Sequence, residues 1–94
     1  ANVEADAGAV SAAESAILVA TQTILAAQST LRLAELTHAR YAGLLSQESV
    51  SQQEFDVVQA HLESATTALC SAESAQRQAD ANRAEAVAVA MLLV

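Results

Sequence analysis

Aliphatic residues recur at every seventh position through the first half of the chain, and this repeat constrains the fold more than any other feature. Counted from Val3, six of the seven positions in this series are aliphatic. Apolar residues at this spacing are the a positions of a coiled coil, in which an apolar stripe packs along a partner helix. The d positions, three residues further on, are mostly alanine. The a positions are Val3, Val10, Ile17, Ile24, Leu31, His38 and Leu45, and the d positions are Asp6, Ala13, Ala20, Ala27, Ala34 and Tyr41.

The second half repeats the pattern from Phe55 and so predicts a second helix. The chain has no proline and only 2 glycines among 94 residues, so few places in it can turn the backbone. The sequence therefore predicts an all-α fold, a long antiparallel two-helix coiled-coil hairpin. The second set of a positions is Phe55, Leu62, Leu69, Gln76, Arg83 and Ala90, and the d positions are Val58, Ala65, Ala72, Ala79, Ala86 and Leu93.

The stretch Ser51-Gln52-Gln53-Glu54 indicates where the second helix begins. It fits a capping box, in which the serine hydroxyl accepts from the amide of Glu54 and the glutamate reaches back to the amide of Ser51. Val50 and Phe55 fit the accompanying hydrophobic staple. We therefore expect one hairpin domain over 1–94, with helix one over about 3–45, a tip at 46–50 and helix two over about 51–92. Whether residues 87–94 finish this helix or begin a strand stays open.

A connection this short makes the two helices antiparallel neighbours and fixes which residues face each other. Large side chains then stand opposite small ones, as a narrow seam requires. The expected pairs are Leu31–Ala65, Ile24–Ala72, Ile17–Ala79, Val10–Ala86, Ala34–Leu62 and Ala27–Leu69, with Tyr41–Phe55 and His38–Val58 near the tip. The pattern weakens at Gln76 and Arg83. The leucines outside the seam indicate lateral packing against further copies or partners; they are Leu18, Leu25, Leu33, Leu36 and Leu44.

Charge excludes several classes of partner. The net charge is −7, with four arginines and no lysine, which argues against binding nucleic acid or an anionic membrane surface. A single cysteine, Cys70, permits neither an internal disulfide nor a cysteine-based zinc site, and its role stays open. Residues 15–31 are uncharged, but threonine and glutamine interrupt them too often for a membrane span, so we interpret them as one side of the seam.

One motif suggests a metal-binding bundle as a competing hypothesis. Glu35 and His38 form a Glu-x-x-His on one helix face, and His61 lies about one turn along the neighbouring helix. Di-iron bundles need two such motifs and two further inward carboxylates, and only one motif is present. We expect no metal and no cofactor. Without a nucleophile–base set or a phosphate loop, we expect no enzymatic activity either.

The tip sequence RYAGLLSQESVSQQEFD resembles the α-helical hairpin of HlyD-type periplasmic adaptors, also called membrane fusion proteins. Tips of that family carry an arginine, a leucine four residues later and a serine seven residues after that. Arg40, Leu44 and Ser51 match these positions. The resemblance implies a tripartite efflux pump or type I secretion system in which these three residues dock on a TolC-like outer-membrane channel. Leu44 is expected to be exposed, because it lies one residue off the a position Leu45. Gly43 departs from the family by standing where a helix former is expected.

The resemblance also implies an assembly and a location. Six adaptors would stand side by side, their hairpins forming a tube in the periplasm, with the full-length protein tethered to the inner membrane. An inner-membrane transporter of the ABC or RND type would be reached through domains that these residues do not include, among them the lipoyl-like and β-barrel domains. The sequence leaves the transporter class and the substrate open. The alternative is a structural or signalling coiled coil without a channel partner, which accounts for the helices but not for the tip.

Overall fold

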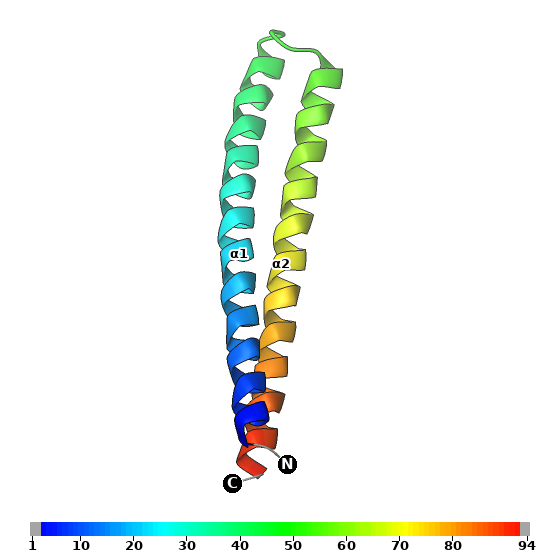
Figure 1. Cartoon of the computed structure of the whole chain (residues 1–94). Helices are drawn as coiled ribbons and strands as arrows, with labels where there is room; N and C mark the ends of the chain where they lie inside the picture. The colour runs from blue at the N-terminus through cyan, green and yellow to red at the C-terminus, as the bar shows by residue number, and fades with distance from the viewer. Residues whose placement is uncertain (1–2, 93–94) are drawn as a thin grey trace. The chain divides into compact units, whose positions relative to one another are not determined.

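The computed structural model describes residues 3–92, with side-chain exposure from Ala7 onward, and it consists of two long helices (Figure 1). Helix α1 spans Val3–Ser46 and helix α2 spans Gln52–Leu92, joined by the short turn between them. The prediction of an all-α fold is confirmed. Because α2 continues to Leu92, the described residues from 87 onward finish the helix and do not begin a strand. The first-heptad residues Val3 and Asp6, and the last d position Leu93, lie outside the residues whose side chains are described.

The chain divides into two compact units, in each of which α1 and α2 run antiparallel. The tip unit is Leu25–Ser71 and contains the turn. The terminal unit combines the part of α1 up to Ile24 with the part of α2 from Ala72. In each unit only one stripe of side chains on each helix is buried, because two helices cover only the faces that meet.

The buried stripe follows the heptad positions. From Val10 to Tyr41, every a and d position of α1 is buried or half-buried. The same holds for α2 from Phe55 to Ala90, except at Arg83, whose charged side chain is exposed. The most buried side chains are Ile24 and three alanines at d positions of α2, namely Ala65, Ala72 and Ala79. Alanine reaches this degree of burial because its small side chain lets the opposite helix approach closely.

One hydrogen bond between the helices agrees with the expected register. In the terminal unit, Gln76 Nε2 donates to Thr21 Oγ1 at 3.3 Å, and Thr21 adjoins Ala20, the residue expected opposite Gln76. The hydrogen bond gives the half-buried amide a partner inside an otherwise apolar seam. Gln76 is therefore accommodated in the stripe, unlike Arg83.

Large apolar side chains remain outside the seam, as four of the five predicted leucines show. Leu18, Leu25, Leu33 and Leu36 are 62%, 52%, 63% and 59% exposed. An isolated pair of helices offers them nothing to pack against. Four large apolar side chains on α1 are therefore left in contact with solvent.

The apolar character of α1 reaches the range of a membrane-spanning helix. The segment Ala7–Ser46 is long and apolar enough to cross a membrane, with a mean hydropathy of 1.4 over its best window. The hydroxyls of Thr21, Thr23 and Thr30 each donate to the carbonyl four residues earlier, so part of their polarity is satisfied within the helix. A single helix of this kind is weak evidence for a membrane span, because the core helix of a soluble protein passes the same test.

Candidate functional site: the hairpin tip

Helix α1 ends in a Schellman motif. The amide of Glu48 donates to the carbonyl of Leu45 at 3.0 Å, and the amide of Ser49 donates to the carbonyl of Leu44 at 2.8 Å. These two bonds satisfy carbonyls that the end of a helix otherwise leaves without partners. The motif requires a left-handed residue between helix and turn, and Glu48 takes that conformation with a φ of 57°.

Glutamate is an unusual residue for this position. A left-handed backbone brings Cβ close to the following carbonyl, so glycine, or less often asparagine, usually occupies it. Among the described residues, only Glu48 combines a side chain with a positive φ. Sequence reasoning predicted a tip at 46–50 but missed the left-handed residue within it, because neither glycine nor asparagine marks that position. The two glycines of the chain lie within α1, and neither has a positive φ.

Helix α2 begins with the predicted capping box. The amide of Glu54 donates to Ser51 Oγ at 3.1 Å, and the amide of Ser51 donates to Glu54 Oε1 at 3.3 Å. Ser51 Oγ also donates to the same carboxylate oxygen at 3.1 Å. The carbonyl of Ser51 accepts the first helical bond, from Phe55. Two local hydrogen-bond motifs, one at each helix end, therefore turn the chain without proline or a left-handed glycine.

The three predicted tip residues all lie in the tip unit, in different surroundings. Arg40 is exposed on α1, one turn before Leu44. Ser51 is exposed as a residue, but its hydroxyl is already engaged with Glu54. Leu44 is half-buried, so the expectation that it is exposed is wrong. It occupies the g position of its heptad, which flanks the seam, and the turn returns to hydrogen-bond its carbonyl.

Aromatic residues fill the seam below the turn. The rings of His38 and Phe55 lie with centroids 5.1 Å apart at an interplanar angle of 44°, and Tyr41 is also half-buried. The register placed Tyr41 opposite Phe55 and His38 opposite Val58, so the observed ring pair is displaced by about one turn. Rings are large enough to reach such diagonal neighbours. The bulk expected at this end of the seam is present, although the partners differ.

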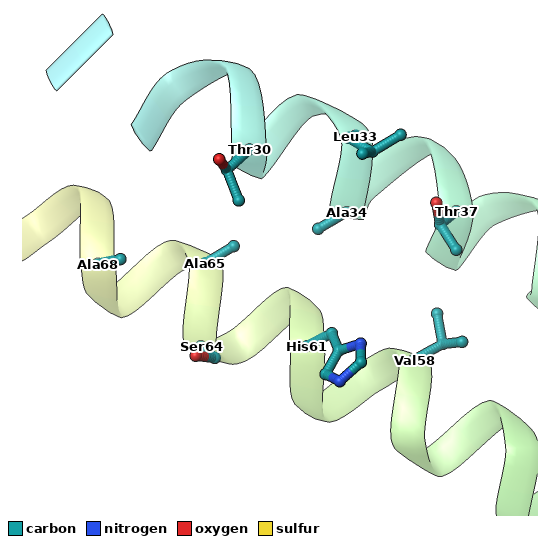
Figure 2. A pocket seen from close by; sticks show the side chains of 9 residues that line it. All are labelled: Thr30, Leu33, Ala34, Thr37, Val58, His61, Ser64, Ala65 and Ala68. Atoms are coloured by element: carbon teal, nitrogen blue, oxygen red, sulfur yellow. The ribbon is translucent and has the colours of Figure 1, made fainter. Parts of the chain in front are cut away.

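A groove of about 410 Å³ runs between the helices below the tip. Figure 2 shows Ala34 of α1 and Ala65 of α2 directed into the space between the helices, with Leu33 and His61 at its margins. No carboxylate or guanidinium lines it. The remaining lining residues are Thr30, Thr37, Val58, Ser64 and Ala68. The small side chains on its floor leave the groove open.

The residues that suggested a metal site or a reactive thiol do not lie together. Within residues 3–92, no group of three or more histidine, cysteine, aspartate or glutamate side chains could hold a metal ion. The ring of His38 lies tilted against that of Phe55, whereas Glu35 and His61 are exposed on separate helices. Cys70 is a free, exposed thiol. Among the described residues, Glu35, His38, His61 and Cys70 therefore do not come together in one site.

The comparison with protein families decides what kind of hairpin this is. Residues 16–89 match the family model described as RND MFP, alpha-helical hairpin domain. The matched segment contains the whole tip and most of both helices. The chain belongs to this family. No curated protein and no solved structure matches the chain significantly.

Membership in the RND MFP family gives the hairpin its general role. Membrane fusion proteins are adaptors of tripartite pumps, and the family is not one of enzymes. Its members work in the periplasm, anchored at the inner membrane, between an outer-membrane channel and an inner-membrane transporter. The resemblance inferred from the tip sequence is thus confirmed, and the turn at Glu48 and Ser51 is the end of an adaptor hairpin.

Proposed function

We propose that the tip of this hairpin docks on a TolC-like outer-membrane channel, and that copies of the protein stand side by side to form a tube, a hexamer in the full-length protein. The observation that carries the docking proposal is Arg40, an exposed arginine within two turns of the end of α1. A guanidinium presents five donors in a fixed plane, which suits the carbonyl groups at the helix ends of a partner. The family match supports the general arrangement.

The three tip residues would contribute unequally to such a contact. Arg40 supplies charge and hydrogen-bond donors. Leu44 offers only part of its surface, because the rest is buried against its own hairpin. Ser51 donates its hydroxyl hydrogen to Glu54 and accepts from the Glu54 amide. A hydroxyl oxygen has two lone pairs, so one remains available to accept from a donor of the channel.

The family description favours an RND transporter as the inner-membrane partner. The hairpin would reach that transporter through domains of the full-length protein that lie outside this chain, and the protein would reside in the periplasm tethered to the inner membrane. The remaining alternative, a structural or signalling coiled coil, requires no channel. The two proposals differ only in the role of the tip, so substitutions at the tip distinguish between them.

The decisive experiment replaces Arg40 in the full-length adaptor. Arg40→Ala is expected to leave helicity and melting unchanged within about 0.5 kcal/mol, because the side chain is exposed. It should weaken capture of the channel by about 2 kcal/mol and reduce substrate export, as loss of an arginine from a small interface does. Arg77→Ala, also exposed but in the terminal unit, is the matched control and should export normally.

Leu44→Ala is a less direct probe than Arg40→Ala. Its side chain is half-buried, so truncation should cost about 1 kcal/mol of folding free energy as well as any contact with the channel. The double variant Arg40→Ala, Leu44→Ala therefore needs its melting temperature measured beside export. Normal export by a folded double variant would remove the docking proposal and leave the coiled-coil alternative.

A further inference from the structure

The face of α1 that points away from α2 carries a large apolar side chain between two arginines. Leu36 occupies the f position of its heptad, the one farthest from the seam, and is 59% exposed. Arg32 and Arg40 lie four residues before and after it and are both exposed. Residues four apart are neighbours on a helix surface. The tip unit thus presents an apolar knob with a cation one turn to either side.

The outward face of α2 carries a hollow of complementary character. Asp56, Gln59, Ala60 and Glu63 line a shallow depression of about 240 Å³. Their spacing is that of the four-residue hole that receives a knob in a coiled coil. Ala60, at the f position, has the smallest side chain of the four, and a carboxylate stands at each end. All four residues are exposed.

We infer that this hollow receives Leu36 of a second copy, standing beside the first at the same height. The side-by-side orientation rests on the proposed function, whereas the register follows from the hairpin itself. When two hairpins point the same way at equal height, α1 of one copy lies antiparallel to α2 of the next, with the pairing found inside each hairpin. Leu36 then falls opposite Ala60, midway between the layers of Ala34 and His38.

The same placement matches the charges. Arg32 comes beside Glu63 of the second copy, and Arg40 beside its Asp56, so an ion pair flanks the apolar contact at each end. An apolar centre with a polar rim is the usual anatomy of a protein interface. The next f positions pair Gly43 with Gln53, where the glycine has nothing within 4 Å of an added Cβ and leaves room for the longer side chain.

Charge also selects the faces that meet. Two α1 faces packed antiparallel about Leu36 would bring Arg32 of one copy against Arg40 of the other. Two α2 faces packed about Ala60 would likewise oppose Asp56 and Glu63. Like charges placed across an interface disfavour these symmetric contacts. The α1-to-α2 contact avoids both repulsions. It also leaves one face free on each copy, so the same contact can repeat from copy to copy. The row of copies closes into a ring if each step includes a rotation.

A cross-linking experiment tests this contact. In a Cys70→Ser background, two differently tagged copies of the full-length adaptor carry Leu36→Cys and Ala60→Cys, respectively. Mild oxidation of the mixture is expected to join the two tags, whereas either copy alone gives little dimer, because facing knob and hole bring Cβ atoms within disulfide range. Replacing Ala60→Cys with Thr67→Cys, one heptad and roughly 10 Å away, should largely abolish the product. Efficient dimers of Leu36→Cys alone, or equal cross-linking to Thr67→Cys, would overturn the inference.

A charge exchange provides the second readout. Arg32→Glu and Glu63→Arg should each weaken self-association roughly fivefold, as loss of an exposed ion pair allows. The double variant restores an ion pair in every contact and should recover most of the association. A double variant weaker than both single ones would overturn the pairing.

The experiments distinguish the lateral contact between copies from the docking of the tip on the channel. Neither self-association readout needs the outer-membrane channel, so an absent cross-link beside an export defect of Arg40→Ala would reject only the lateral contact. The Leu36–Ala60 cross-link should survive in an Arg40→Ala variant, because the second ion pair and the apolar contact remain. If it does survive, the export defect of that variant arises at the channel.

Discussion

The amide of Ser49 donates to the carbonyl of Leu44 at 2.8 Å, so the backbone of the turn closes directly on the last turn of α1. This bond depends on the left-handed conformation of Glu48, which lies between the two residues. A side chain in that conformation costs about 1 kcal/mol relative to glycine. The turn is therefore held by hydrogen bonds and is at the same time strained at one residue.

Replacing Glu48 with glycine should stabilise the hairpin. Glycine adopts a positive φ without the steric penalty, so Glu48→Gly is expected to raise the free energy of unfolding by about 1 kcal/mol, measured by urea denaturation. Gln47→Gly is the matched control, since its backbone lacks a positive φ and gains nothing. If Glu48→Gly, like Gln47→Gly, failed to raise the free energy of unfolding, that result would argue against the Schellman turn.

Loss of the cap should destabilise α2. Ser51→Ala removes the oxygen that accepts from the Glu54 amide and should cost about 1 kcal/mol in thermal or urea unfolding. Ser51→Asp keeps an acceptor at the N-cap and should recover much of that loss. If aspartate restores stability but not export, the serine hydroxyl has a role beyond capping. Equal stability of the alanine and aspartate variants would contradict the capping role.

The register within the tip unit predicts a specific disulfide. In a Cys70→Ser background, cysteines at Ala27 and Leu69 should cross-link readily within one chain, because antiparallel seam partners bring their Cβ atoms into range. A pair displaced by about one turn, Ala27 with Thr66, should react poorly, since Thr66 is exposed while Leu69 is half-buried. Electrophoretic mobility under non-reducing conditions distinguishes the two. Preferential reaction of the displaced pair would show that the register is wrong.

The exposed leucines predict that stability depends on concentration. A seam with few large side chains stabilises a lone hairpin weakly against the entropy of ordering two long helices. If copies cover one another's leucines, the melting temperature should rise as protein concentration increases. Leu36→Gln removes an exposed apolar side chain and should reduce that dependence, with little effect at high dilution. A high melting temperature that does not change with concentration, in a protein that sediments as a monomer, would contradict this.

The heptad repeat made it possible to predict the two helices and the side chains that they bury. Heptad spacing identified the buried positions of both helices, because a two-helix seam is set by helical geometry and little else. At Arg83, one of the two a positions where the pattern was expected to weaken, the charged side chain is exposed. The cap at Ser51 was predictable because its partners lie three residues apart in sequence.

The parts of the tip that escaped prediction depend on the fold of the turn. Nothing in the sequence marks Glu48 as left-handed, since its usual signals, glycine and asparagine, are absent there. The exposure of Leu44 was misjudged because adjacency to Leu45 was taken to point it outward, whereas a g position flanks the seam. The hollow around Ala60 was also missed, although its spacing was readable from the sequence. Only its place on the outward face of α2 makes it a recess.

The local closure of the turn also sets an order of events for folding. Closing the few residues between Ser46 and Gln52 costs little chain entropy, whereas bringing the far ends of the helices together across an unformed hairpin costs much more. Each layer that forms shortens the loop that the next layer must close, so the helices should zip from the turn outward. Substitutions near Glu48 and Ser51 should then slow folding, and substitutions in the terminal unit, such as Ile17→Ala, should mainly speed unfolding. The residues proposed to meet the channel would be the first part of the protein to take shape.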